Sequence, residues 1–252
     1  MANDLLSIGP IINDLRTRTI SDFEEKNAPL ISSTIAEMGR MYALRTYCLL
    51  KGFNFTSGNI IELLSLLLKS EDIIVSAFQM AKQRAAIETV ALLRIALESA
   101  TTALHIAKDT KAMAAYLGGR YKSTNSISFS RKHISVVPEL WTALSRTAVH
   151  VHPITFGPER HFSSADEIMR LIRVNYDVRP GTPHQDSFLL HTVSLVSLVA
   201  YRVFEIIFCT PASFRGCCGL AMPSIGCFIT GKATDDLIQD YFGRITELAR
   251  SV

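Results

Sequence analysis

The chain has 252 residues, of which 48% are hydrophobic and 19% are charged, with a formal net charge of +3. This length can build one sizeable hydrophobic core, and without a Gly/Ser-rich or Pro-rich linker we expect a single helical domain over residues 1–252. The nearly neutral charge gives no global argument for a nucleic-acid-binding protein, and it does not exclude a local basic patch.

The predicted location is the cytoplasm, without membrane association. The first residues, MANDLLSIGP, lack the basic and apolar regions of a secretory signal. Two segments, 86–107 and 188–209, are apolar enough to raise the question of a membrane span. Both contain ionisable residues, and a charge at the centre of a membrane helix costs about 2.5–3.5 kcal/mol. We therefore expect two buried helices of a soluble bundle.

The cysteines predict neither disulfides nor a metal site, and we expect no cofactor. Thiols stay reduced in the cytoplasm, the number of cysteines is odd, and no Cys-x-x-Cys pair occurs. The cysteines are Cys48, Cys209, Cys217, Cys218 and Cys227.

Helical periodicity dominates the first half of the chain. Residues 5–16 predict a short helix that bends or restarts at Pro10, and Pro29 opens a longer helix that ends near Gly52. Residues of the longer helix are spaced for one face, namely Ile31, Ile35, Met38, Tyr42 and Arg45.

The next segments predict two more helices. Ser57 can cap a helix through Lys69, and Ser70, which two acidic residues follow, suits the start of the next. Unbroken to Lys108, this helix would be about 57 Å long, whereas a compact chain of this size is about 46 Å across. We therefore expect a break around residues 83–86.

The second half continues the helical pattern, and the predicted fold class is all-α: a multi-helix bundle with two central apolar helices that carry polar stripes. Asp109 caps a helix to about Gly118, the Ser-rich residues 123–133 are interpreted as a loop, and Pro138 occupies the first position of another helix. Residues 188–209 predict the last long core helix. Other predicted segments are a short helix with a capping box at Ser164 and Glu167, a strand candidate at 173–178, an irregular stretch at 210–232 and a C-terminal helix over 233–251.

The first polar stripe lies on residues 86–107. Arg94, Glu98 and His105 fall within about 40° of one another on a helical wheel, in otherwise apolar surroundings. Because a buried charge needs a hydrogen-bonded partner, Arg94 and Glu98 should be mostly buried, and each should contact another helix. We expect residues 188–209 to supply these contacts.

A second stripe lies on residues 188–209, within about 80° on the wheel. It consists of His191, Ser194, Leu198, Arg202 and Glu205. If the two helices face each other, Arg202 and Glu205 can exchange partners with the charged pair of the first stripe. Two interpretations stay open: a buried ion-pair network that fixes the helix register, or a pocket whose guanidinium groups hold a small anionic ligand.

Residues 144–153, LSRTAVHVHP, are another candidate site, with Arg146, His150 and His152. In a first interpretation, two imidazoles on one side of an extended segment begin a metal site, with Glu98, His105 or His191 as further ligands. We do not adopt this interpretation. In a second interpretation, Arg146 stabilises charge on a phosphate while His152 acts as general acid–base. In a third, the histidines cap the helix end and bond to backbone or carboxylate groups.

Two other segments contain motif-like patterns. Residues 226–232 match G-x-x-x-x-G-K, but Ala233 stands where Ser or Thr should bind magnesium and no strand precedes the match, so we attribute it to chance. Residues 120–133 interleave cations with Tyr121 and Phe129, which suits either a solvated loop or a surface that contacts single-stranded RNA.

Short motifs in the middle of the chain resemble those of an uncharacterised bacterial family of helical domains of unknown function. Its members have an apolar helix with Arg and Glu four residues apart, followed by a Leu-Ser-x-x-x-Val-His-Pro-like segment. The resemblance covers residues 70–210, which would form the core of the domain. The matching residues here are Arg94, Glu98, Leu144, Ser145, Val149, His150, His152 and Pro153.

More distantly, the helical layout and the spacing of Arg146 and His152 resemble the HEPN superfamily. Its active members are metal-independent ribonucleases of toxin–antitoxin and antiphage systems, in which a paired Arg and His meet at a dimer interface and cleave RNA through the 2′-hydroxyl. The resemblance implies a homodimer that binds RNA, with Arg146 as the phosphate clamp and His152, beside His150, as the acid–base residue. Many members of the superfamily are not catalytic, so the alternative function is a non-enzymatic helical module that binds a ligand or a protein.

Overall fold

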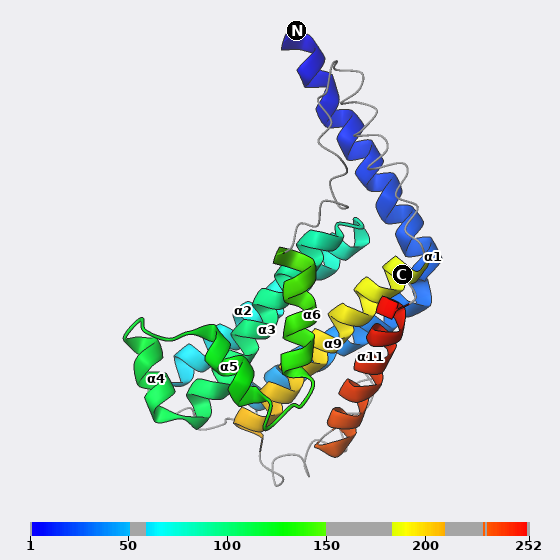
Figure 1. The fold of residues 1–252 in the computed structure, drawn as a ribbon. Coiled ribbons are helices and arrows are strands. Elements are labelled where there is room, and N and C mark those ends of the chain that lie inside the picture. The colour runs from blue at the N-terminus through cyan, green and yellow to red at the C-terminus, as the bar shows by residue number, and fades with distance from the viewer. Residues whose placement is uncertain (1, 51–58, 150–182, 210–228, 230, 251–252) are drawn as a thin grey trace.

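The structure, a computed structural model, describes residues 2–50, 59–149, 183–209, 229 and 231–250 (Figure 1). Within these ranges every helix or strand element is an α-helix, which confirms the predicted all-α fold class. The helices are α1 (Ala2–Leu50), α2 (Ile60–Lys82), α3 (Ala86–Lys108), α4 (Thr110–Leu117), α5 (Ser123–Ser130), α6 (Val137–Val149), α9 (Pro183–Phe208) and α11 (Lys232–Arg250). The predicted short helix after Ser164 and the strand candidate at residues 173–178 lie outside the described residues.

Helix α9 is the centre of the bundle. It packs against α1, α2, α3 and α11, and its residues are buried without interruption from Leu189 to Tyr201. A helix that is apolar on all sides is stable in water only when neighbours cover all of its sides. Helices α2 and α3 form an antiparallel pair beside α9, α5 and α6 cover α3, and α11 lies along α9 (Figure 1).

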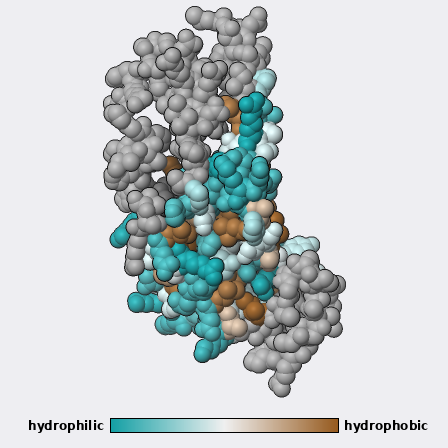
Figure 2. Space-filling view, turned by 90° about the vertical axis from the view of Figure 1, so that its right-hand side faces the viewer, coloured by the Kyte–Doolittle hydropathy of each residue, from teal (hydrophilic) through white to brown (hydrophobic). Residues whose placement is uncertain are grey.

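Helices α3 and α9 are long and apolar enough to cross a membrane by length and composition alone. In the structure, 61% of the most apolar stretch of α3 and 83% of that of α9 are buried. Core helices of soluble proteins meet the same criteria, so these two helices are weak membrane-span candidates. Among the residues coloured in Figure 2, hydrophilic ones predominate, and the hydrophobic ones form separate patches. The cytoplasmic location stays a prediction.

Helix α1 differs from the prediction in its first half. The helix predicted at residues 5–16 continues through Pro10 as far as Asn27, whose backbone angles are not helical (φ −116°, ψ 15°). Ion pairs between side chains one turn apart and the fully buried Phe23 stabilise the added turns. The second stretch of α1 begins beside Pro29, as predicted, because proline fits the first turn of a helix.

The predicted break between α2 and α3 is confirmed, but the predicted helix start at Ser70 is wrong. Helix α2 runs without interruption through Ser70, which is fully buried and donates a hydrogen bond to the carbonyl of Ala96 in α3 (2.9 Å). The hydroxyl that suits a helix cap therefore joins two helices instead. The chain turns at residues 83–85, where Arg84 adopts a left-handed backbone conformation (φ 54°).

The predicted loop at residues 123–133 is also wrong, because helix α5 occupies most of it. Ser126 is fully buried, and its hydroxyl hydrogen-bonds to the carbonyl of Ser123 (2.6 Å) and to the hydroxyl of Thr101 in α3 (3.1 Å). Ile127 is buried next to it. Small side chains let α5 lie close to α3, and this packing stabilises a helix that a serine-rich sequence does not favour by itself.

The remaining helices begin close to their predicted positions. Asp109 caps α4 by accepting hydrogen bonds from two backbone N–H groups of its first turn (2.8 and 3.2 Å). Helix α6 begins at Val137, next to the predicted start at Pro138, and α11 begins at Lys232. Helix α9 begins at Pro183, somewhat earlier than predicted. The start of α4 depends on local capping chemistry, which is present in the sequence itself.

A buried ion pair joins three parts of the fold. Arg84, in the turn between α2 and α3, donates two hydrogen bonds to Asp186 at the start of α9 (3.1 and 2.9 Å). Asn27, at the kink of α1, donates to the same carboxylate (3.1 Å). The side chains of Arg84 and Asp186 are only 6% and 2% exposed. The pair therefore fixes the kink and the turn against the central helix.

Replacing Asp186 by alanine should lower the free energy of unfolding by about 3 kcal/mol, because the buried Arg84 guanidinium loses its main partner and keeps only the partly exposed Asp22 (3.0 Å). Urea denaturation followed by circular dichroism measures the loss. The matched control is Asp14→Ala, which removes an exposed carboxylate paired with Arg18 and should cost less than about 1 kcal/mol. Equal urea midpoints for the two variants would show that the buried pair does not hold the fold together.

Candidate functional site

The predicted stripe on α3 faces α6 rather than α9. Glu98 accepts hydrogen bonds from Arg94, one turn earlier (3.2 Å), and from the indole N–H of Trp141 in α6 (2.8 Å). The Arg94 guanidinium lies over the Trp141 ring, 5.2 Å from its centroid. Both charged residues contact another helix, as predicted, but the prediction that α9 supplies the contact is wrong. Their side chains are 29% and 22% exposed, so both are mostly buried, as predicted, although neither is fully removed from solvent.

His105, the third residue of the stripe, is held by aromatic neighbours. Its Nδ1 lies 2.8 Å from the hydroxyl of Tyr121, and its ring stacks on Phe129 with 4.4 Å between centroids. Burial lowers the pKa of His105, and Asp109 opposes this shift. Burial raises the pKa of Tyr121. Both side chains are therefore uncharged at neutral pH, and the imidazole can accept the phenol proton in a hydrogen bond.

The predicted stripe on α9 faces α1 and α11, so the two stripes do not meet. Arg202 donates two hydrogen bonds to Asp235 of α11 (2.9 and 3.0 Å) and pairs with Glu205 (2.9 Å). Glu205 accepts the backbone N–H of Gly231, immediately before α11 (2.6 Å). A carboxylate at this position complements the helix dipole and binds a free N–H group. The predicted exchange of partners with the α3 stripe is therefore wrong.

His191 and Ser194 occupy the first half of α9. Ser194 donates a hydrogen bond to Thr34 of α1 (3.1 Å), and the ring of His191 lies against Tyr241 of α11, with 5.6 Å between centroids. Nδ1 of His191 is buried without a hydrogen-bond partner among the described residues. Burial lowers the pKa of His191, and the nearby Arg244 adds to the shift. His191 therefore packs as a neutral side chain between α9 and α11.

Of the predicted catalytic residues, Arg146 alone lies in the described part of the chain. It belongs to the last turn of α6, is exposed, and forms no ion pair with a described residue. His150 and His152 lie outside the described residues, so their position relative to Arg146 stays a prediction. Among the residues that the structure describes, no three His, Cys, Asp or Glu side chains form a group that could hold a metal ion.

A cleft of about 440 Å³, here called the polar cleft because most of its lining residues are polar, opens beside the α3 stripe. Its polar lining consists of Lys69 of α2, Glu98, Ser99 and Thr102 of α3, Tyr116 of α4, Tyr121, and Ser123 of α5. Two lining residues, Glu98 and Tyr121, contact residues of the predicted stripe through the hydrogen bonds described above. The stripe thus borders a solvent-accessible cleft as well as the contact with α6.

The sequence points to Glu98, and to Tyr121 only as part of the basic segment 120–133, but not to the other residues of this cleft. Lys69 is predicted at a helix end, yet it lies within α2 and on the cleft surface. Tyr121 reaches the cleft because the chain reverses after α4 at Gly119, whose φ of +67° is a left-handed conformation that glycine adopts without strain. The Gly-Gly pair that contains Gly119 was the available signal for this reversal.

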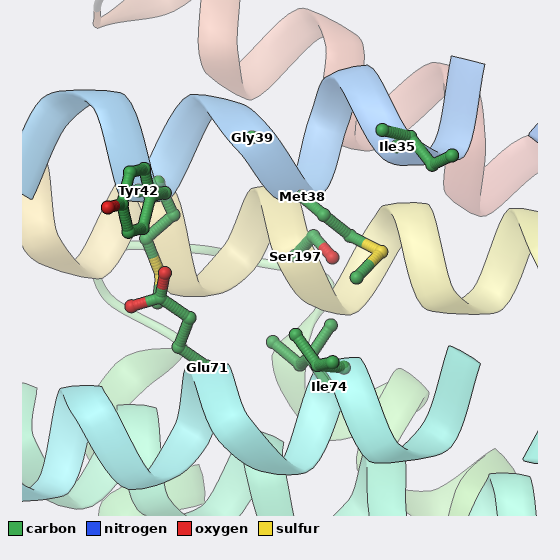
Figure 3. Close-up of a pocket in the computed structure, with 9 residues that line it drawn as sticks. Ile35, Met38, Gly39, Tyr42, Glu71, Ile74 and Ser197 are labelled. Atoms are coloured by element: carbon green, nitrogen blue, oxygen red, sulfur yellow. The ribbon is translucent and has the colours of Figure 1, made fainter. Parts of the chain in front are cut away.

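A second concavity, of about 260 Å³, is almost entirely apolar, and we refer to it as the apolar groove (Figure 3). Its walls are α1, with Met38 and Tyr42, and α2, with Ile74. Helix α9 passes between these walls and contributes Ser197 (Figure 3). None of the predicted site residues lines the apolar groove.

The basic segment forms part of a smaller hollow of about 200 Å³. Arg131, Lys132 and His133 line it together with Asp235 and Gln239 of α11. Burial lowers the pKa of His133, and the neighbouring cations add to the shift. The interpretation of this segment as a surface that contacts RNA stays a prediction.

Comparisons with protein families, with curated proteins and with solved structures gave no match to this chain. The resemblances to the bacterial helical family and to the HEPN superfamily therefore stay predictions that depend on short motifs.

The partial solvent exposure of Glu98 predicts a moderate effect on stability. Glu98→Ala removes the acceptor of the Trp141 N–H and the partner of Arg94, and should lower the free energy of unfolding by about 1–3 kcal/mol. Glu98→Gln retains an acceptor oxygen and should lose clearly less. Urea denaturation followed by fluorescence measures both, because Trp141 is the only tryptophan of the chain. If Glu98→Ala unfolded at the wild-type midpoint, the α3–α6 contact would contribute no stability.

Proposed function

We propose that this chain is a non-enzymatic helical module that binds a small organic anion in the polar cleft. The observation that carries the proposal is the charge of the cleft. Lys69 forms no ion pair with a described residue, whereas Glu98 is already neutralised by Arg94. The cleft therefore presents one uncompensated positive charge, and an anionic ligand would complete the pair.

Free hydroxyl groups supply the hydrogen bonds that an anion needs. Ser99, Tyr116 and Ser123 line the cleft, and none of their side chains hydrogen-bonds to a described residue. Each hydroxyl can donate to a carboxylate or phosphate oxygen, and such charge-assisted bonds are stronger than those between neutral groups. The cleft thus combines one cation with several donors.

The two tyrosines add an aromatic wall to the cleft. The rings of Tyr116 and Tyr121 meet edge to face with centroids 6.0 Å apart, and the hydrogen bond to His105 holds the second ring in place. Leu66 and Ile95 contribute apolar surface. Small-molecule sites usually combine such surface with a few polar groups in a volume of about 300–1,000 Å³. The ligand that fits is a small anion with an apolar or aromatic body.

Trp141 provides the readout for this proposal, because its N–H bonds to Glu98 at the edge of the cleft. Benzoate, adenosine monophosphate and inorganic phosphate are titrated into the purified protein while tryptophan fluorescence is followed. We expect a saturable change with benzoate or adenosine monophosphate, and weaker binding of inorganic phosphate, which has no ring. Lys69→Ala should raise the dissociation constant about tenfold, which corresponds to about 1.4 kcal/mol.

The matched control is Lys111→Ala, which removes an exposed lysine of α4 that does not line the cleft. This variant should bind like the wild type. A loss of binding in both variants, or in neither, would contradict the assignment of the site to the polar cleft. If none of the three anions changed the fluorescence or gave heat in calorimetry, the proposal of an anion-binding module would be wrong.

A second candidate function, metal-independent RNA cleavage, is favoured by the exposed Arg146. Its guanidinium lies in the last turn of α6 without an ion-pair partner among the described residues, so it is available to a phosphate. The HEPN resemblance gives His152 the acid–base role, with His150 beside it, in a homodimer. This candidate needs residues beyond those that the structure describes.

For this second candidate, the protein is incubated with mixed-sequence RNA in the presence of EDTA. Cleavage that leaves cyclic-phosphate ends is expected, and Arg146→Ala and His152→Ala should each slow it about 100-fold, because they remove charge stabilisation and proton transfer. Lys111→Ala again serves as the control for a general loss of positive charge. Cleavage at the wild-type rate in His152→Ala would identify a contaminating nuclease, and an absence of cleavage would exclude this function.

A further inference from the structure

Tyr121, which lines the polar cleft, is the last of three titratable side chains that lie next to one another. Its hydroxyl lies 2.8 Å from Nδ1 of His105, and Nε2 of the same imidazole lies 3.7 Å from Oδ2 of Asp109. The His105 side chain is 12% exposed, whereas that of Asp109 is 40% exposed. We refer to Asp109, His105 and Tyr121 as the relay. It connects the start of α4 with the wall of the polar cleft.

The carboxylate of Asp109 determines which nitrogen of His105 holds the proton. Its Oδ1 accepts hydrogen bonds from the backbone N–H groups of Lys111 and Ala112, and these bonds lower the pKa of Asp109. Asp109 is therefore ionised at neutral pH, and its Oδ2 faces His105. A negative charge beside Nε2 favours the tautomer with the proton on that nitrogen. Nδ1 then has a lone pair and no proton, so the Tyr121 hydroxyl donates to it.

The Tyr121 hydroxyl therefore supplies no proton to the cleft while His105 is neutral. A phenol has one proton to donate, and when that proton is bonded to Nδ1 the phenol presents only lone pairs to a ligand, which repel an anion. Protonation of Nδ1 reverses the hydrogen bond, because an imidazolium donates from both of its nitrogens. The phenol oxygen then accepts from His105, and its own proton becomes available to an acceptor in the cleft.

Burial and Asp109 together set how readily His105 takes up this proton. Burial lowers the pKa of His105 below its ordinary value of 6.5, and among the described residues Asp109 is the charged group that opposes the shift. Tyr121 is the other titratable group that faces the imidazole, α5 has no ionisable side chain, and neither Lys108 nor His133 shifts this pKa. An anion bound beside Tyr121 would stabilise the imidazolium further, so binding should raise the pKa of His105.

We propose that the relay couples anion binding in the polar cleft to the uptake of one proton from solvent at Nδ1 of His105. The imidazolium donates to the phenol oxygen, and the Tyr121 hydroxyl donates to the bound anion. This inference rests on the proposed anion site and adds to it a further donor and a dependence on pH. Because binding takes up a proton, affinity should rise as pH falls through the pKa that His105 has in the complex, and should level off below its pKa in the free protein.

Titration of benzoate at several pH values between 8 and 5.5 tests the proposal, with Trp141 fluorescence as the readout. Benzoate is the suitable probe because a carboxyl group stays ionised above about pH 5.5, whereas the phosphate of adenosine monophosphate itself titrates near pH 6. The dissociation constant of the wild type should fall about tenfold from pH 8 to pH 5.5. Calorimetry at pH 7 in Tris and in imidazole buffers, whose ionisation enthalpies differ, should show proton uptake on binding.

Two variants assign this dependence to the relay. His105→Gln removes the titrating group, so its dissociation constant should not change with pH. Tyr121→Phe keeps the ring and removes the hydroxyl, so it should bind at every pH about as weakly as the wild type does at pH 8. The matched control is His184→Gln, which removes an exposed histidine of α9 that does not line the cleft and should keep the wild-type dependence.

The outcomes separate this inference from the proposed function. Circular dichroism and urea midpoints establish that each variant is folded, and the two-buffer experiment needs no variant. An absence of benzoate binding at every pH would overturn the anion site, and this inference with it. Binding that depends on Lys69 but has the same dissociation constant at every pH, binding without proton uptake, or an unchanged pH dependence in His105→Gln would overturn this inference alone.

Discussion

The fold depends on the buried ion pair between Arg84 and Asp186. Taking two charges out of water costs several kcal/mol per ion, and only close geometry with further hydrogen bonds offsets that cost. Arg84 and Asn27 can both donate hydrogen bonds to Asp186 only when the α2–α3 turn, the kink of α1 and the start of α9 lie together. Arg84 also lies near the ring of the buried Phe23, 5.8 Å from its centroid, so the same guanidinium contacts the first half of α1. Because Asp186 fixes where α9 enters the bundle, it also sets which residues of α9 face α1, α3 and α11.

The polar side chains of the apolar helices form separate local networks rather than one central network. Arg94 and Glu98 join α3 to α6 through Trp141. Arg202 and Glu205 join α9 to the beginning of α11, where Asp235 accepts from Arg202 and the Gly231 N–H donates to the Glu205 carboxylate. Each network is completed by a residue of one neighbouring helix, so each specifies which helix packs where. A charge placed in an apolar surround in this way contributes to the choice of a single arrangement, even where it adds little net stability.

The two concave surfaces differ in the physical basis of recognition. The polar cleft offers a cation, hydroxyl donors and two aromatic rings, so it would distinguish ligands by charge and by the positions of acceptor atoms. The apolar groove offers mainly apolar side chains, and the charges of Arg45 and Glu71 beside it cancel, so shape rather than charge would govern a contact there. The two surfaces share no lining residue, although α2 contributes to both.

The sequence by itself determined the features that depend on local chemistry. Helical periodicity predicted the all-α fold class, and the limited width of a compact chain predicted the break after α2. The capping side chain of Asp109 predicted the start of α4. Tertiary structure decided the features that depend on a neighbour. A helical wheel fixes the angles between Arg94, Glu98 and His105, but not the direction in which the whole stripe points, so the contact with Trp141 could not be derived. A serine hydroxyl can form its hydrogen bond in either of the arrangements considered, so Ser70 could cap one helix or join two, and Ser126 could belong to a loop or to a helix. The observed arrangements depend on hydrogen-bond partners that are distant in sequence. These partners are the carbonyl of Ala96 for Ser70 and the hydroxyl of Thr101 for Ser126.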